Sequence, residues 1–301
     1  MAVKRILLFL LTNIAVMFVL SISYNVICRL IGPEALAEFT KSGIDFGFIA
    51  VWAAVFGFGG AFISLLISKP MAKWSTHATV IDGSEGPAER WLVDTIGQLA
   101  ERAHVKMPEV AIYPGEANAF ATGAFKNSAL VAVSTKIMEQ MSREELRAVL
   151  GHEMSHVANG DMVTLTLLQG VLNAVVLFLS RVIGHIAANA MSGGKERRGG
   201  SSGMFYLVYY VMQMVLGIGA SIIVYSFSRR REYAADRGSA ELLVSPAPMI
   251  AALRRLGNLQ AGVLPDSLKA MGIAGRHTSI FSTHPSLEDR IAALEKLQLG
   301  A

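Results

Sequence analysis

Cysteine and charge are both scarce in this sequence. Its 301 residues include one cysteine, Cys28, which excludes an intrachain disulfide framework. Because Cys28 lies in an apolar run, we interpret it as a small buried hydrophobic residue. Charged residues make up only 17% of the chain, whereas hydrophobic residues make up 52%. This balance is more apolar than that of an ordinary soluble domain and indicates a protein that contacts a lipid bilayer.

A basic stripe is also missing. The formal net charge is +4 and the sequence pI is about 9.2, but the lysine and arginine residues are scattered and are not interleaved with aromatic residues. Nucleic-acid-binding proteins usually concentrate their positive charge on one face. We therefore expect no nucleic-acid partner, and we interpret the modest positive charge as suited to anionic lipid.

Four apolar segments reach the length of about 20 residues that a membrane-spanning helix needs. They are nearly free of charge and cover residues 6–31, 46–68, 162–180 and 204–227. The first is too long for a signal peptide and lacks a small-residue cleavage site, so we expect it to be retained. The second pair could instead form a re-entrant or cytoplasmic hairpin.

Basic residues beside the first two spans predict their orientation. Lys4 and Arg5 precede the first span, and Lys69 and Lys73 follow the second, whereas the loop between the spans is acidic on balance. By the positive-inside rule, we expect the N-terminus and the segment after residue 69 to lie in the cytoplasm.

Residues 70–161 combine helix and strand signals. Apolar residues spaced three and four apart predict an amphipathic helix over residues 89–105. Three short apolar runs follow at 109–113, 118–125 and 128–134, separated by turn-forming residues. We expect these runs to form a small antiparallel sheet.

A well-marked helix start precedes a histidine motif. Ser142 and Glu145 have the spacing of a capping box, and the sequence from residue 143 to HEMSHVANG predicts a helix. His152 and His156 lie four residues apart, so both imidazoles emerge from one face and can bind one zinc ion. Glu153 is placed to act as general base on a water molecule beside that ion. The alternative is a surface helix that carries two histidines by coincidence.

A hydrolytic zinc site needs a third protein ligand. Glu232 is the best candidate, because crossing the bilayer twice, or not at all, returns the chain at that point to the side of His152. Asp236 lies one turn further along and could orient a ligand imidazole by accepting its second N–H. Alternatively, Glu232 and Asp236 could be solvated neighbours of Arg230 and Arg237.

Four motifs in the sequence resemble those of the HtpX-type membrane metalloproteases, relatives of the CAAX prenyl proteases. The motifs are NAFATG (118–123), HEMSHVANGD (152–161), SRRREYAAD (228–236) and STHPSLEDRI (282–291). The order of apolar and polar segments is similar to that family over essentially the whole chain. The resemblance implies that Glu232 is the third zinc ligand and that the active site faces the cytoplasm at the bacterial inner membrane. It also implies that such an enzyme helps to degrade damaged or misfolded membrane proteins under stress.

The resemblance suggests further site residues. Asn118, Ala119 and Phe120 would form an edge strand that pairs with a substrate peptide, although a plain core strand is the alternative. His284 could stabilise the oxyanion of the reaction, or it could simply begin a helix. Arg290 is similar to a family position near the active site, and its alternative role is a structural ion pair.

These observations predict a mainly α membrane protein that contains an α+β zincin-like metalloprotease domain. We expect a small antiparallel sheet, a HExxH helix and four candidate transmembrane helices. The predicted organisation is a membrane hairpin, the first part of the protease domain, a second apolar hairpin and the rest of the protease domain, over residues 1–69, 70–161, 162–227 and 228–301.

The predicted function is that of a zinc endopeptidase with one zinc ion per chain. Its expected partners are the lipid bilayer and unfolded or membrane-protein polypeptides. A catalytically silent zinc-binding scaffold is the alternative. A transporter or channel is disfavoured because the spans carry almost no ionisable groups at bilayer depth.

Overall fold

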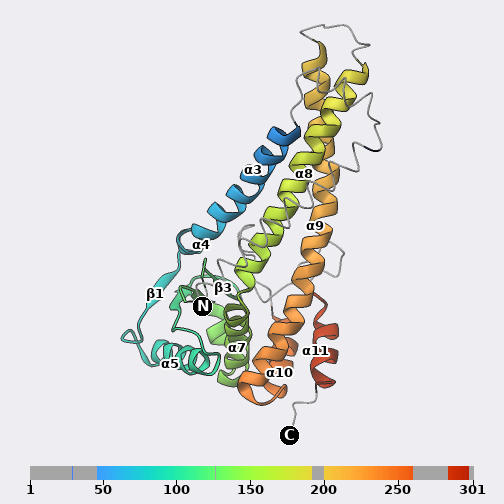
Figure 1. Ribbon diagram of the computed structural model, residues 1–301. Coiled ribbons are helices and arrows are strands. Elements are labelled where there is room, and N and C mark those ends of the chain that lie inside the picture. The colour runs from blue at the N-terminus through green and yellow to red at the C-terminus, as the bar shows by residue number, and fades with distance from the viewer. Residues whose placement is uncertain (1–28, 30–45, 126, 192–199, 260–283, 298–301) are drawn as a thin grey trace. The chain divides into compact units, whose positions relative to one another are not determined.

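The computed structural model describes residues 29, 46–125, 127–191, 200–259 and 284–297 of the chain, which are mostly helical with one small sheet (Figure 1). The helices are α3 (Phe46–Leu66), α4 (Ser68–Thr76), α5 (Pro87–Arg102), α6 (Thr135–Gln140), α7 (Arg143–Asn159), α8 (Asp161–Met191), α9 (Gly200–Leu243), α10 (Ala247–Asn258) and α11 (Leu287–Glu295). The strands are β1 (Thr79–Ile81), β2 (Glu109–Tyr113), β3 (Ala119–Thr122) and β4 (Leu130–Ser134).

The chain divides into two compact units. The described residues of the first unit are 46–63 of α3, 166–191 of α8 and 200–222 of α9, and we call it the helical unit. The second unit comprises the described residues of Ser64–Leu165 and of the chain from Ile223 onward, and we call it the sheet unit. The predicted division of the sequence into four parts stays a prediction.

Three helices are long and apolar enough to cross a membrane, among the residues that the structure describes. They are Phe46–Leu66, Asp161–Met191 and Gly203–Leu243, and they overlap the predicted spans 46–68, 162–180 and 204–227. The predicted span 6–31 lies outside the described residues, apart from Arg29. Helix α8 runs beyond the predicted end at residue 180. It continues through Arg181, whose guanidinium lies 4.4 Å from the ring centroid of Trp52 on α3, a favourable cation–π geometry.

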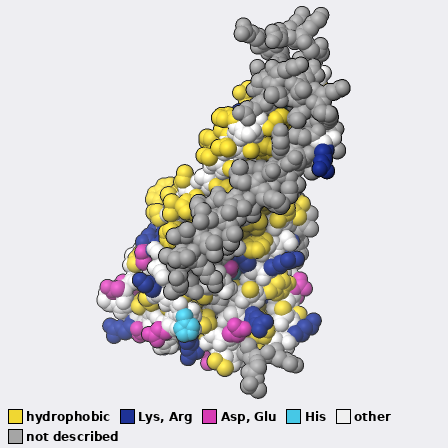
Figure 2. All heavy atoms as spheres, viewed as in Figure 1, with side chains coloured by type: hydrophobic (Ala, Val, Ile, Leu, Met, Phe, Trp, Pro, Cys, Tyr) yellow, Lys and Arg dark blue, Asp and Glu magenta, His cyan; other side chains and the backbone are white. Residues whose placement is uncertain are grey.

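Helices α3 and α8 pack closely within the helical unit. A Cβ atom added to Gly57 of α3 would stand 2.5 Å from the backbone nitrogen of Ala174, so only glycine allows this approach. Buried hydrophobic side chains surround that contact, namely Phe46, Ile49, Ala53, Ala174, Phe178 and Val182. Figure 2 shows hydrophobic side chains also gathered on the outer surface where α3 lies in Figure 1. An apolar outer surface of this kind is suited to lipid.

The sheet of the sheet unit is mixed, so the prediction of an antiparallel sheet is wrong. The strand order is β1-β2-β4-β3. Strands β1 and β2 pair antiparallel, as do β3 and β4, but β2 and β4 pair parallel. The chain reverses after β2 and again after β3, so β4 runs in the same direction as β2 and lies beside it. The three-residue strand β1 was too short to be predicted from alternation.

Helices cover both faces of this sheet. Alternate strand residues such as Val110, Ala121 and Val131 belong to the core formed with α5 and α7. The residues between them, such as Phe120 and Leu130, pack on the other face, where Ala72 of α4 joins them. Strand β3 is the edge strand nearest to α7, and α7 also packs against α5 and α10.

Helix α9 is longer than predicted. We expected a span ending at residue 227, followed by a separate helical stretch, but a single helix of 44 residues runs from Gly200 to Leu243. Loss of hydropathy at Ser228 changes the surroundings of a helix but does not require the helix to end, because residues 228–243 include neither glycine pairs nor proline. The segment with Glu232 and Asp236 is therefore interior to α9.

Candidate active site

The start and end of α7 fix the histidine motif within a rigid helix. Ser142 accepts a hydrogen bond from the backbone N–H of Glu145, and the Glu145 side chain accepts one from the backbone N–H of Ser142, so the predicted capping box is confirmed. The helix ends at Gly160, whose φ of 69° is the left-handed conformation that favours glycine. Residues 152–156 lie in the buried C-terminal half of this helix.

Small residues bring α9 against α7. A Cβ atom added to Gly151 of α7 would stand 2.8 Å from the Oγ of Ser239, and one added to Gly238 of α9 would stand 2.6 Å from the Oγ of Ser155. The Ser239 hydroxyl donates to the carbonyl oxygen of Ala148 at 2.7 Å. This close contact sets the separation of the two helices that carry His152, His156 and Glu232.

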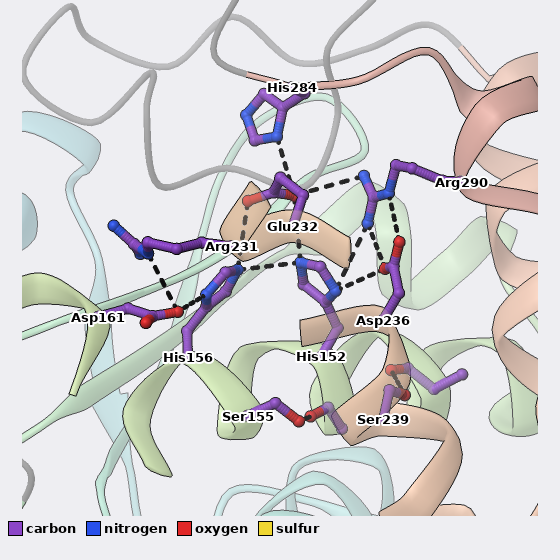
Figure 3. Close-up of polar contacts among 12 residues, drawn as sticks. His152, Ser155, His156, Asp161, Arg231, Glu232, Asp236, Ser239, His284 and Arg290 are labelled. Carbon is purple, nitrogen blue, oxygen red and sulfur yellow. Dashed lines mark hydrogen bonds and ion pairs between the residues drawn. The ribbon is translucent and has the colours of Figure 1, made fainter. Parts of the chain in front are cut away.

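Two histidines of α7 and one glutamate of α9 converge (Figure 3). The Nε2 atoms of His152 and His156 are 3.1 Å apart. Glu232 directs its carboxylate at both, with Oε2 at 3.5 Å from His152 Nε2 and Oε1 at 3.4 Å from His156 Nε2. This is the group among the described residues whose ligand atoms, all within 4.8 Å of one another, could hold a metal ion.

The other ring nitrogen of each histidine faces a carboxylate. His152 Nδ1 is 2.9 Å from Asp236 Oδ1, and His156 Nδ1 is 2.6 Å from Asp161 Oδ2. A carboxylate accepts the Nδ1 proton, so each Nε2 can offer its lone pair to a metal ion that displaces the proton held there without metal. Two lone pairs and a carboxylate that face one another need a cation between them. The donor set therefore fits a divalent metal, and two histidines with one glutamate are typical ligands of catalytic zinc.

The charges of the site point to the same requirement. Burial favours neutral imidazole, but hydrogen bonds to Asp161 and Glu232 outweigh it and raise the pKa of His156 to about 10. Burial alone would raise the pKa of Glu232, yet the charge of His284 and hydrogen bonds from both ligand histidines hold it well below its usual range. The carboxylates thus draw positive charge to the point where the ligand atoms meet.

Arg290 of α11 holds the carboxylate behind His152. Its Nη2 and Nε lie 2.6 Å and 2.8 Å from the two oxygens of Asp236, a bidentate pair that is fully buried. Burial opposes ionisation of Asp236, but Arg290 lowers its pKa to about 2. His284 is also buried, with Nδ1 at 3.0 Å from Glu232 Oε2. The structure therefore brings both C-terminal residues singled out by the sequence to the His–His–Glu group.

Glu153 lies beside the candidate ligands but does not belong to them. Its side chain is buried, and the backbone N–H of Ala121 on β3 faces its carboxylate. Burial raises the pKa of Glu153 to about 7, partly offset by the charges of His152 and His156. The group can accordingly take up or release a proton near neutral pH.

Within the described part of the chain, no strand pairs with the outer edge of β3, which we call its free edge. Its register with β4 pairs Phe120 with Ala132, and the Ser134 N–H donates to the Asn118 carbonyl. Residues 119 and 121 alternate with these, so their backbone groups point away from β4. Asn118 is buried and caps this edge, since its side-chain oxygen accepts from the N–H of Ala119 at 2.9 Å. The three residues singled out as a substrate edge thus lie at or next to the outer strand of the sheet.

Two residues of the site were not identified from the sequence as site residues. Asp161 contacts His156 and directly follows Gly160, the glycine that ends α7. Its place just after the histidine helix was the signal that could have indicated a contact with His156. Arg231, which lies 3.2 Å from Asp161 through its Nε, belongs to the motif SRRREYAAD but was given no role of its own.

Comparisons with known proteins agree with this geometry. Residues 87–298 match the family model of peptidase family M48. The chain is 54% identical over 292 residues to a protease HtpX homolog from Verminephrobacter eiseniae. This alignment covers 97% of this chain and 98% of the relative. It is also 54% identical over 302 residues to a protease HtpX homolog from Bordetella pertussis. That alignment covers 99% of this chain and 100% of the relative. The resemblance predicted from the motifs is confirmed.

A solved structure shares the fold. The crystal structure of S. mikatae Ste24p superposes with a TM-score of 0.59 over 94% of this chain and 67% of that chain, at 18% identity.

Proposed function

We propose that this chain, which belongs to peptidase family M48, is a zinc endopeptidase that holds one zinc ion. Family membership makes it a metalloprotease, and its apolar helices make it a membrane protein that contacts the lipid bilayer. The proposal of a zinc endopeptidase with one zinc ion depends on the residues of the sheet unit.

The convergence of His152, His156 and Glu232 carries the proposal. Each residue offers one ligand atom to a common point, and carboxylates fix the orientation of both imidazoles. When bound there, zinc would polarise the scissile carbonyl and lower the pKa of a water molecule. Burial of all three residues excludes competing solvent from that point.

Glu153 is the proposed general base. It follows a ligand on α7, is buried, and has a pKa near neutrality, so it can accept a proton from water and donate it to the departing amine. Burial supports this role, because it raises the pKa of the carboxylate into the range that a base working near neutral pH needs.

The free edge of β3 is the proposed binding site for the substrate backbone. A peptide that pairs with residues 118–120 would add a strand to the sheet next to α7. Backbone pairing is independent of side-chain sequence, which suits an enzyme that acts on unfolded polypeptides. The proposed substrates are therefore damaged or misfolded membrane proteins, degraded at the cytoplasmic face of the bacterial inner membrane in a stress response.

His284 and Arg290 have separate proposed roles. His284 lies 3.0 Å from the candidate ligand Glu232, where a ring N–H could stabilise the oxyanion that forms from the scissile carbonyl. Arg290 would act through Asp236, because its two short contacts go to that carboxylate. It would orient His152 without contacting substrate.

Casein hydrolysis by detergent-purified protein tests the proposal. Protein stripped of metal should be inactive and should regain activity with zinc. Glu153→Gln should bind zinc without turnover, and Glu232→Ala should lose both. Glu144→Gln, at an exposed position in the first turn of the same helix, is the matched control and should remain active. Zinc binding by the wild type without hydrolysis would instead support the scaffold alternative.

The single cysteine permits a test of sidedness. In a Cys28→Ser background, Lys106→Cys places one thiol at an exposed position of the sheet unit. A maleimide that cannot cross membranes should label this thiol in lysed cells but not in intact spheroplasts. Equal labelling in both would contradict a cytoplasmic active site.

A further inference from the structure

We propose that Asp161 and Arg231 form a positioning pair for His156, matching the pair that Asp236 and Arg290 form for His152 (Figure 3). The inference rests on the proposed zinc function, since it assigns residues that hold a proposed ligand in place.

The two pairs have the same order of contacts. On one side, Asp236 Oδ1 lies 2.9 Å from His152 Nδ1 and 2.6 Å from Arg290 Nη2. On the other, Asp161 Oδ2 lies 2.6 Å from His156 Nδ1 and 3.2 Å from Arg231 Nε. In each case one carboxylate oxygen joins an imidazole to a guanidinium, and both imidazoles direct Nε2 at the common point.

Local structure brings Asp161 to this position. Gly160 ends α7 in the left-handed conformation and turns the chain so that the first residue of α8 can contact His156, five positions earlier. The carboxylate of Asp161 is buried, with a side-chain exposure of 9%, and Arg231 is nearly buried at 14%. A carboxylate in such surroundings needs charge compensation, which the guanidinium supplies.

Arg231 also links this pair to the third ligand. It directly precedes Glu232 on α9. The same short stretch of helix therefore places Glu232 beside the Nε2 atoms of the histidines and Arg231 beside the carboxylate of Asp161. A displacement of α9 would consequently disturb a ligand and the support of another ligand together.

The physical role of the pair is to fix the tautomer and ring orientation of His156. Asp161 accepts the hydrogen bond from the Nδ1–H of His156, which directs Nε2 at the common point, and Arg231 holds the carboxylate in place. Neither residue lies among the candidate ligands. Both are positioning residues, and the single contact of Arg231, compared with the bidentate contact of Arg290, predicts a smaller effect for Arg231.

Zinc affinity, measured by competition with a chromogenic chelator, tests the pair without reference to hydrolysis. Asp161→Asn should raise the zinc dissociation constant about 10–100-fold, as loss of a carboxylate behind a ligand histidine usually does. Arg231→Met should raise it about tenfold, at the low end of that range, and Arg231→Lys should recover part of the loss because it restores the positive charge. Arg231→Met should add little in the Asp161→Asn background. Arg237→Gln, which removes an exposed ion pair with Glu241 on the same helix, is the control and should leave affinity unchanged.

A spectroscopic measurement separates orientation from stability. With cobalt in place of zinc, the visible absorption bands of Asp161→Asn should shift, since a tilted imidazole changes the ligand field. Wild-type zinc affinity and an unshifted cobalt spectrum in both Asp161→Asn and Arg231→Met would overturn the inference.

The pair can also be examined in metal-free protein. In protein labelled with ¹⁵N at histidine, the Nδ1 proton of His156, assigned through a His156→Gln variant, should resonate far downfield and lose that shift in Asp161→Asn. If the wild type bound no zinc, the proposed function would fail, and this resonance would still decide the contact. If zinc affinity fell as expected but wild-type protein hydrolysed nothing, the pairing would stand and the endopeptidase proposal would fail. An unchanged resonance in Asp161→Asn would overturn the pairing in either case.

Discussion

Gly238 of α9 lies so close to Ser155 of α7 that a Cβ atom added to it would stand 2.6 Å from the serine Oγ and 2.8 Å from its Cβ. Contacts below 3 Å require one helix to move. Because Ser155 lies between the two ligand histidines, the approach of these helices sets the position of Glu232.

Gly238→Ala should therefore weaken the metal site and the fold together. Overpacking of this kind costs about 1–3 kcal/mol, and the outward shift of α9 should lower zinc occupancy. The measurements are zinc content by mass spectrometry and the thermal midpoint in detergent. Gly217→Ala is the matched control, because a Cβ atom at this α9 position meets nothing within 4 Å. Equal zinc content in the two variants would contradict the prediction.

Removal of the metal should destabilise the sheet unit. Zinc would join His152 and His156 of α7 to Glu232 of α9, and a ligand that binds only the folded protein stabilises it. Zinc at 100 times its dissociation constant should stabilise the folded protein by about 2.7 kcal/mol.

The check is a thermal scan of stripped protein with and without zinc. Glu153→Gln should show the same zinc-dependent rise in midpoint as the wild type, and Glu232→Ala should show little. A zinc-dependent rise of full size in Glu232→Ala would exclude Glu232 as a ligand.

Arg290→Met should be strongly destabilising. It leaves Asp236 as a buried charge without its partner, a change that costs about 3–5 kcal/mol. The double variant Arg290→Met/Asp236→Asn should recover part of that loss, since the uncompensated charge is then gone. Denaturant titration in detergent gives the free energies of unfolding.

An exposed ion pair between α10 and α11 provides the comparison. Arg254 of α10 and Glu295 of α11 are more than half exposed, so Arg254→Met should cost less than about 1 kcal/mol. Similar losses for Arg254→Met and Arg290→Met would show that burial of Asp236 is not the cause.

Ser142→Ala should lower stability without altering the chemistry of the site. Loss of this N-cap removes a hydrogen bond to Glu145 and costs about 1 kcal/mol. Ser142→Asp should retain most of that stability, because aspartate also caps helices well. Zinc content per folded molecule should be unchanged in both, and a decrease would mean that the cap positions the ligands as well.

Local spacing predicted the parts of the site that lie on one helix. The capping box at Ser142 and the four-residue interval between His152 and His156 depend only on helix geometry. Glu232 and Asp236 required more, because a contact between distant segments has no periodic signature. For Glu232, the order of the spans permitted the contact and the resemblance to a family implied it, and Asp236 was then inferred from its place one turn further along.

Three features exceeded what the sequence could indicate. The parallel pairing of β2 with β4 depends on two chain reversals whose outcome is not encoded in the alternation of either strand. The continuity of α9 past residue 228 depends on helix propensity rather than hydropathy. The contact of Arg231 with Asp161 joins distant segments of the chain, for which the sequence has no periodic signal.

The matching intervals on α7 and α9 restrict how the gene can change in length. His152 and His156 are one helical turn apart, as are Glu232 and Asp236, and each helix turns by about 100° per residue. Insertion or deletion of one codon within residues 148–161 or 231–239 would rotate part of a helix away from its partners. Epitope tags and reporter insertions should therefore be placed between the exposed residues Ser84 and Glu85, in the turn between β1 and α5, where added length leaves both intervals intact.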